Sequence, residues 1–153
     1  MLPATILFTL PSLSPTHSKL PRVLAICKAL DRQRFQPLVS VDHAGRLNPD
    51  GLRLLNEAEV PVYVIRMSPH RRALARSLAE MVGTPQVLRR ARVVIQHSSD
   101  YSWQWTEPVL ARLGGVQYWV TTKTNLLVNG WNWRVRLRLA KRMIIEAPQV
   151  AAY

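Results

Sequence analysis

The chain has 153 residues, which is about one domain and enough to bury a hydrophobic core. Lysine and arginine total 21 against 9 aspartate and glutamate, and the formal net charge of +12 favours an anionic partner: nucleic acid, an acidic lipid surface or a phosphorylated substrate. The single cysteine, Cys27, excludes an internal disulfide and a zinc-finger set, and its apolar neighbours predict an inert core residue in a reducing compartment.

The first apolar run, residues 4–10, is too short to span a membrane, and no basic stretch precedes it. Pro3 and Pro11 flank the run, and this pattern does not fit a signal peptide. We therefore expect a cytoplasmic chain whose first strand begins almost at Met1.

Short apolar runs alternate with longer amphipathic ones along the chain, which predicts strands alternating with helices. The predicted strands are residues 4–10, 35–41, 60–67, 93–96 and 116–121. The predicted helices are residues 20–30, 50–58, 71–82, a short helix capped by Thr84 with Pro85 in its first turn, 105–113 ending at Gly114–Gly115, and 132–147. This alternation predicts an α/β domain with a parallel sheet and helices on both faces.

Ligands bind outside the carboxyl ends of the strands in open parallel sheets, and polar residues follow the predicted strands at these points. The residues are His17 after the first strand, His43 after the second, His70 after the third, His97 at the end of the fourth, and Thr121, Thr122, Lys123 and Asn125 after the fifth. All four histidines therefore map to one edge of the predicted sheet. The alternative is that they are polar loop residues placed there by chance.

The segment 96–100, with the sequence QHSSD, is the best single candidate for chemistry. A histidine titrates near neutral pH, so His97 at a strand end can orient or deprotonate a hydroxyl group. Asp100 fits two roles equally well: it can hold the imidazole or an acceptor hydroxyl, or, like Ser99, it can cap the following helix.

Other catalytic and cofactor motifs are absent from the sequence. The first strand is not followed by a G-x-G-x-x-G dinucleotide fingerprint, and neither a phosphate-binding P-loop nor a G-x-S-x-G nucleophile elbow occurs. The histidines lack the close spacing of metal ligands. We therefore expect no bound cofactor and no metal site.

The predicted helix 132–147 carries a basic face and an apolar face that includes Trp133. The basic face is formed by Arg134, Arg138, Lys141 and Arg142. Each basic residue contributes roughly 1 kcal/mol near an anionic membrane, so this helix predicts reversible docking rather than anchoring. The alternative is a core-packing helix with a solvated basic face. Residues 133–139 also alternate apolar and basic, which is a strand-like period, but length favours the helix.

Several segments in this order resemble the amino-terminal domain of family-four glycosyltransferases, which have two Rossmann-like domains in the GT-B fold. The segments are residues 6–10 followed by Arg22–Val23–Leu24, the strand 59–64 with its "G-[VI]-P-V" likeness, the strand 93–98 ending in His97 and Ser98, and the helix, double-glycine turn and strand of 107–122. The segments 122–125 and 130–142 further resemble a subset in which a "K-x-N" strand end leads to a tryptophan-containing basic helix.

The resemblance implies half of a GT-B fold, with residues 1–148 as the acceptor-side domain, residues 149–153 as the start of a linker or a truncated tail, and the donor-binding domain absent. It implies retaining transfer from a nucleotide-sugar, a co-substrate rather than a cofactor, to a saccharide or lipid-linked acceptor. His97 aligns with a histidine near the transferred sugar, and Lys123 and Asn125 would face the same cleft.

One departure from the family concerns the loop after the first strand, which usually contains glycines that let the backbone approach the donor phosphates. Residues 12–19 contain no glycine, although four hydroxyls and the charge of Lys19 are available. The residues assigned to the cleft are Ser12, Ser14, His17, Lys19, His43, Ser98, Lys123 and Asn125, with His97 and Asp100 as catalytic candidates.

The chain ends about where the interdomain linker would begin, so we expect it to be inactive alone or to depend on a separately encoded carboxy-terminal domain. The alternative function is a non-enzymatic basic module for an anionic membrane or nucleic acid. Its basic residues do not interleave with aromatics, which disfavours nucleic acid. Docking at the inner face of a membrane is a further expectation.

Overall fold

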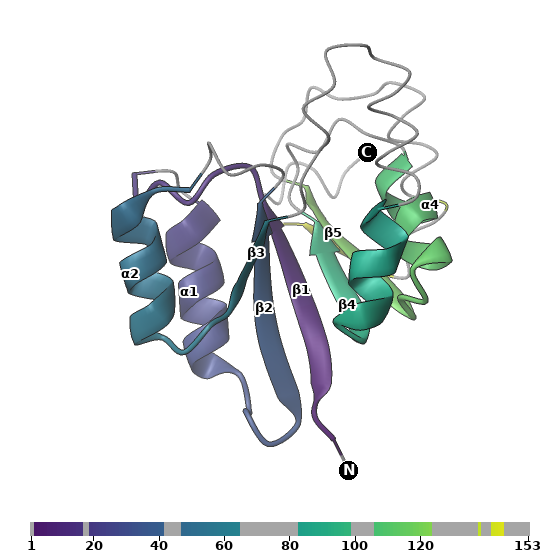
Figure 1. Ribbon diagram of the computed structural model, residues 1–153, viewed down its shortest axis with the longest axis horizontal. Helices are drawn as coiled ribbons and strands as arrows, with labels where there is room; N and C mark the ends of the chain where they lie inside the picture. Colours follow the sequence, from purple (N-terminus) through teal and green to yellow (C-terminus); the bar gives the residue numbers. More distant parts are fainter. Residues whose placement is uncertain are drawn as a thin grey trace.

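Six parallel strands form one sheet in the computed structural model, which describes residues 2–16, 19–41, 47–64, 83–98, 106–123, 138 and 142–145 (Figure 1). The strands are β1 (Ala4–Leu10), β2 (Phe35–Val41), β3 (Val62–Val64), β4 (Val93–Ser98), β5 (Tyr118–Lys123) and β6 (Arg142–Ile145). The helices are α1 (Lys19–Ala29), α2 (Pro49–Glu57) and α4 (Thr106–Leu113), and residues 83–90 are also helical. The predicted fold class, a Rossmann-like α/β domain, is confirmed.

The strand order β3-β2-β1-β4-β5-β6 places β1 and β4 side by side in the middle of the sheet. The chain winds outward from β1 to β3, returns to β4, and winds outward again to β6. Every pairing is parallel, so the carboxyl ends of these strands meet at one edge. Ligands in such sheets bind where the direction of winding reverses, which here is the carboxyl edge between β1 and β4.

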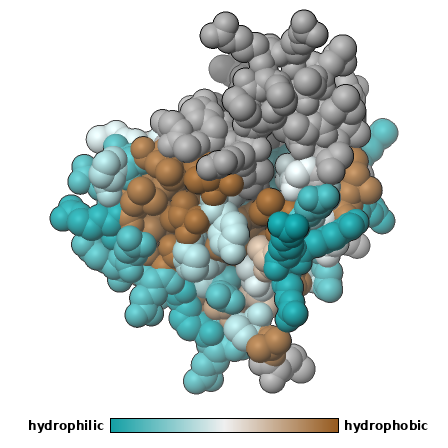
Figure 2. Space-filling model, viewed as in Figure 1, coloured by the Kyte–Doolittle hydropathy of each residue, from teal (hydrophilic) through white to brown (hydrophobic). Residues whose placement is uncertain are grey.

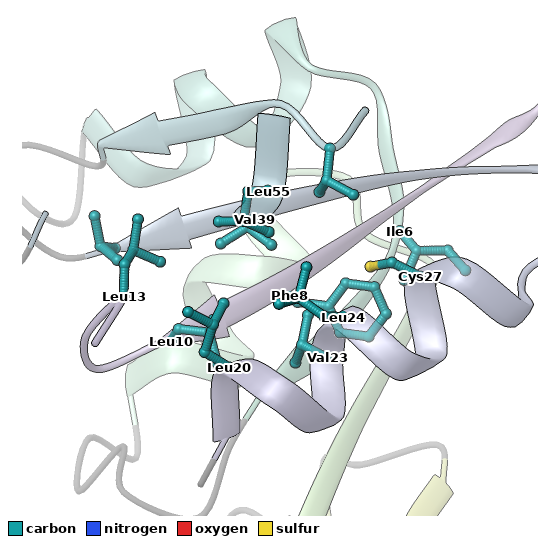
Figure 3. Close-up of a cluster of buried hydrophobic side chains, with 12 residues drawn as sticks. Ile6, Phe8, Leu10, Leu13, Leu20, Val23, Leu24, Cys27, Val39 and Leu55 are labelled. Carbon is teal, nitrogen blue, oxygen red and sulfur yellow. The ribbon is translucent and has the colours of Figure 1, made fainter. Parts of the chain in front are cut away.

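One face of the sheet packs against α1 and α2 around a hydrophobic core. Ile6, Phe8 and Leu10 alternate along β1 and point to this face, where they meet Val23 and Leu24 of α1 (Figure 3). Burying each such side chain contributes about 1.5–3 kcal/mol. This packing therefore holds α1 and α2 on one face, as Figure 1 shows.

The opposite face packs against α4 and the helical residues 83–90. Its core contains Leu7 and Trp119 from the strands, Leu88 and Ala111 from the helices, and Val116 from the turn before β5. The turn at Gly114–Gly115 closes α4 as predicted, and the φ of +84° at Gly115 is one that glycine adopts without strain.

The loop between β1 and α1 is held against α2 by a close backbone approach. The Leu13 side chain is fully buried in the hydrophobic core between the sheet and helices α1 and α2. A Cβ atom placed at Gly51 would overlap the Leu13 carbonyl oxygen and lie 2.9 Å from the Leu13 Cβ atom. The loop lacks the glycines that the family usually has there, and the glycine that permits its path lies in the facing helix.

The carboxyl end of the predicted helix 132–147 is wrong, because Arg142–Ile145 form β6 and pair with β5. The run R-M-I-I is short, apolar and partly β-branched, and it suits a parallel strand that borrows its hydrogen bonds from a neighbour. Arg138 is helical and exposed, whereas Arg142 lies in the sheet opposite Val120. A continuous basic helical face through Arg142 therefore does not exist.

Several other boundaries differ from the prediction. The third strand is shorter than 60–67 within the described residues, the fourth extends to Ser98, and the fifth runs from Tyr118 to Lys123. Thr84 is itself helical, so its predicted role as an N-cap is wrong. The predicted helix 71–82 lies outside the described residues. Among the helices that the structure describes, none has the length and apolar character needed to cross a membrane.

Candidate functional site at the carboxyl edge of the sheet

A row of small hydroxyl side chains crosses four neighbouring strands at the carboxyl edge. Ser40 of β2 lies opposite Thr9 of β1, Thr9 lies opposite Ser98 of β4, and Ser98 lies opposite Thr121 of β5. Residues opposite one another in a parallel ladder point to the same face. Ser40, Ser98 and Thr121 are buried and Thr9 is half-buried, so this hydroxyl row forms a polar layer on the α4 face.

Glu107, in the first turn of α4, accepts hydrogen bonds from this polar layer. The Ser98 hydroxyl donates to Oε2 at 2.6 Å, and the Thr9 hydroxyl donates to Oε1 at 3.1 Å. Gln96 lies two residues before Ser98 on the same face of β4, and its side-chain amide nitrogen donates to Oε1 at 3.2 Å. The half-buried carboxylate therefore ties β1, β4 and α4 together, and hydrogen bonds to a charged group are about twice as strong as neutral ones.

Two buried side-chain atoms of the polar layer and its neighbour Gln96 lack a hydrogen-bond partner within the described parts of the chain. They are the side-chain amide oxygen (Oε1) of Gln96 and the hydroxyl of Thr121, and these residues are 3% and 0% exposed. Buried polar atoms in native proteins are nearly always hydrogen-bonded. Gln96 donates to Glu107 and Thr121 belongs to the hydroxyl row, so both atoms border the polar layer.

His97 points to the opposite face from Ser98, because side chains alternate along a strand. Its ring packs against Phe8, with ring centroids 5.5 Å apart and planes tilted by 54°. The His97 carbonyl oxygen accepts from the Thr9 hydroxyl at 3.2 Å, so this one hydroxyl contacts both the His97 backbone and Glu107. The half-buried imidazole thus lies on the α1 side of the carboxyl edge.

The loop after β1 is organised by its own hydroxyls. The Ser14 backbone N–H donates to the Ser12 hydroxyl at 3.2 Å, and the Ser14 and Thr16 hydroxyls lie 2.8 Å apart. Lys19 opens α1 and is 9% exposed. The predicted cleft residues Ser12, Ser14 and Lys19 thus lie at the carboxyl end of β1 or directly beyond it.

The other predicted site residues are described only in part. Lys123 ends β5 at the same edge, paired with Ile145 of β6. His17, His43, His70, Asp100, Asn125, Trp133, Arg134 and Lys141 lie outside the described residues. The parallel order of the strands fits the expected edge, but the convergence of the four histidines stays a prediction.

Glu107 was missed by the sequence prediction. An acidic residue in the first turn of a helix is usually explained by its favourable interaction with the helix dipole, and this explanation gives no reason to assign the residue to a functional site. The available signal was the pattern of Gln96 and Ser98 two apart on one predicted strand, which places two hydrogen-bonding side chains on the same face.

Cys27 is buried in the first core, as predicted for an inert residue. Burial raises the pKa of its thiol to about 11, with the Arg32 charge opposing the shift. Because the thiolate is the reactive form, Cys27 is a poor nucleophile in the folded protein.

No family model matches the sequence, and no curated protein matches it either. Solved structures do match over nearly the whole chain. MurG of Acinetobacter baumannii is 20% identical with a TM-score of 0.66, over 95% of this chain and 42% of that one. A protein assigned as a UDP-N-acetylglucosamine 2-epimerase from Listeria monocytogenes is 11% identical with a TM-score of 0.67, over 99% and 42%. HepE from Anabaena, solved with UDP and glucose, is 18% identical with a TM-score of 0.65, over 96% and 39%.

These likenesses define the fold: a single Rossmann-like α/β domain that matches one half of a GT-B glycosyltransferase. The chain spans about two fifths of the length of the structures that it matches. At these identities the likeness extends to the fold and not to the family-four assignment.

Proposed function

We propose that this chain supplies the acceptor-side, amino-terminal half of a GT-B glycosyltransferase that uses a nucleotide-sugar. The observation that carries the proposal is the match of 96% of the chain to HepE, a protein solved with UDP and glucose. A second matched structure carries UDP-N-acetylglucosamine in its name, so UDP, free or as part of a UDP-sugar, is named for both proteins. The candidate site lies at the carboxyl edge beside β1 and β4, the position expected for a ligand in this fold.

His97 is the proposed catalytic residue of this half-site. Its imidazole stands at the carboxyl edge against Phe8, and an imidazole is able to exchange a hydrogen bond or a proton with an acceptor hydroxyl. The retaining course of the reaction, the saccharide or lipid-linked acceptor, and the second domain that completes the cleft follow from the family-four resemblance and are part of the proposal.

Nuclear magnetic resonance of the ¹⁵N-labelled full chain tests the proposal. UDP-glucose and a soluble saccharide, added separately, are expected to shift backbone signals at the carboxyl ends of β1 and β4 and in residues 11–16. Release of UDP is expected to be absent for the chain alone. Shifts confined to the amino ends of the strands, or no shift with either ligand, would refute the assigned site. Transfer of glucose from UDP-glucose by the chain alone would refute the proposal that a second domain is needed to complete the cleft.

A basic binding module is the second candidate, favoured by an arginine group on the α4 side. Arg89, Arg90, Arg92 and Arg112 are exposed, and the Arg89 guanidinium donates to the Leu113 carbonyl oxygen at 2.6 Å, which joins the helical residues 83–90 to the end of α4. Figure 2 shows strongly hydrophilic side chains on the side of residues 83–90, whereas the side of α1 and α2 carries a hydrophobic patch bordered by hydrophilic side chains. This arginine group lies near the amino ends of β4 and β5, away from the candidate site.

A further inference from the structure

We infer that Glu107 is a positioning residue for the carboxyl end of β4, and that it fixes the peptide that carries His97. The inference rests on the proposed function, because it assigns Glu107 a part in the same half-site. Glu107 acts through other residues: Thr9, Gln96 and Ser98 contact its carboxylate directly.

The contacts of Glu107 exceed what its place in a helix requires. An acid that only offset the helix dipole would be equally effective with its carboxylate in water near the first turn. Instead both oxygens are engaged by side chains from two strands, over sequence separations of 98 residues to Thr9 and 9 residues to Ser98. Such convergence fixes where α4 begins relative to β1 and β4.

The network holds His97 from both sides along the chain. Gln96 and Ser98 are the residues before and after His97, and both donate to Glu107. The Thr9 hydroxyl contacts the His97 carbonyl oxygen as well as Glu107. The pleat sends the His97 side chain to the α1 face, where it meets Phe8. The contacts of its two neighbours and of its own carbonyl oxygen hold this stretch of β4 in place.

Geometry and charge can be separated at this position. Glutamine at 107 keeps one carbonyl oxygen for Thr9 and Gln96 and can donate its amide to the Ser98 hydroxyl, which is able to accept. Glu107→Gln therefore removes the charge and retains the network. Glu107→Ala removes the network and leaves the buried Gln96 amide without this acceptor.

The test uses the full chain, with Glu107→Ala and Glu107→Gln compared against Glu57→Ala as the control. Glu57 is exposed in α2, and its carboxylate lies 4.0 Å from the Arg53 guanidinium. Two quantities are measured: the ring signals of His97, assigned with His97→Gln, and the dissociation constants of UDP-glucose and a soluble saccharide. Thr9→Val is a second variant that removes one hydroxyl at constant shape, and it replaces Glu107→Ala if that variant does not fold.

We expect Glu107→Ala to shift the His97 ring signals and to weaken binding about tenfold, because the three hydrogen bonds that hold the His97 peptide in place are lost. Glu107→Gln and Glu57→Ala are expected to stay within about twofold of the wild type, because the network is retained in the first and untouched in the second. Unchanged His97 signals in Glu107→Ala, or in Thr9→Val where it takes that variant's place, would overturn the inference. Equal losses in the alanine and glutamine variants would also overturn it, because charge alone would then explain the effect. If the wild type binds neither ligand, the proposed function fails, while the His97 signals still decide the positioning role.

Discussion

His97 and Ser98 are neighbours in β4, and the pleat sends their side chains to opposite faces of the sheet. His97 meets Phe8 on the α1 side, and Ser98 meets Glu107 on the α4 side. Two consecutive residues at a strand end therefore lie in different environments: His97 contacts an aromatic ring and Ser98 contacts a carboxylate. A single substitution at either position is expected to affect only one of them directly.

At the residue scale, Gly51→Ala is expected to destabilise the protein. The added Cβ atom would overlap the Leu13 carbonyl oxygen, and overpacking against backbone costs about 1–3 kcal/mol. Gly83→Ala is the matched control, because a Cβ atom there meets nothing within 4 Å and Gly83 is helical. The control is expected to be neutral or to stabilise by up to about 1 kcal/mol through helix propensity. Urea unfolding measures both, and equal effects would contradict the close approach.

Cys27 is expected to make stability fall at alkaline pH. Burial raises its pKa from the ordinary 9.0 to about 11, so the folded protein holds the thiol proton more tightly than the unfolded chain. The stabilisation is complete below pH 9 and is lost as the pH rises toward about 11. At about 1.4 kcal/mol per pKa unit, a rise from 9.0 to about 11 limits this loss to at most roughly 3 kcal/mol.

The measurement is the free energy of unfolding between pH 8 and about 11, compared with that of Cys27→Ala. The variant is less stable because it loses buried contacts, but its decline with pH is expected to be shallower. Parallel curves for the two proteins would show that other groups cause the decline.

At the element scale, α2 begins at a side-chain cap. The Asn48 side chain accepts from the backbone N–H groups of Asp50 at 3.0 Å and Gly51 at 3.2 Å, and Pro49 follows in the first turn. This cap helps to set the position of Gly51 against the loop after β1. The start of the helix and the path of that loop are therefore coupled.

Asn48→Ala is expected to lower the free energy of unfolding by about 1 kcal/mol, because two helix N–H groups lose their acceptor. Asn48→Ser keeps an acceptor and is expected to lie within a few tenths of the wild type. Urea unfolding at neutral pH checks both variants. A serine variant as unstable as the alanine variant would mean that capping is not the cause.

At the scale of the whole molecule, part of the positive charge that makes up the net +12 lies away from the candidate site. The segments 83–98 and 112–118 contain four arginines and no acidic residue, whereas Glu107 is central to the carboxyl edge. If the chain were a basic binding module, its affinity for a polyanion would fall steeply with salt. The glycosyltransferase proposal does not predict a surface that binds polyanions tightly.

Binding of a fluorescent heparin or DNA oligomer is therefore expected to be weak at physiological salt. Changing Arg89, Arg90, Arg92 and Arg112 to glutamine together is expected to leave the shifts induced by UDP-glucose unaltered. Fluorescence anisotropy over a range of salt concentrations measures the first quantity. Tight polyanion binding that these four substitutions abolish would favour the alternative function.

The sequence by itself determined the parallel α/β order, the bounds of β1 and β2 and, to within one residue, those of α1, α2 and α4, because periodicity, turns and caps are local properties. It also identified His97 and Ser98 at a strand end. It did not predict β6, since the short run Arg142–Ile145 is stable as a strand only when β5 supplies its hydrogen bonds.

Only the tertiary structure decided which residues meet at the carboxyl edge. A register shift between β1 and β4 near Thr5 and Ile6 moves the pairing by one residue, so Thr9 lies opposite Ser98 instead of His97. That shift places the Thr9 and Ser98 hydroxyls on one face, within reach of Glu107. Such contacts join segments up to 98 residues apart, and the register shift that brings them together is a property of the paired strands rather than of either strand's own sequence.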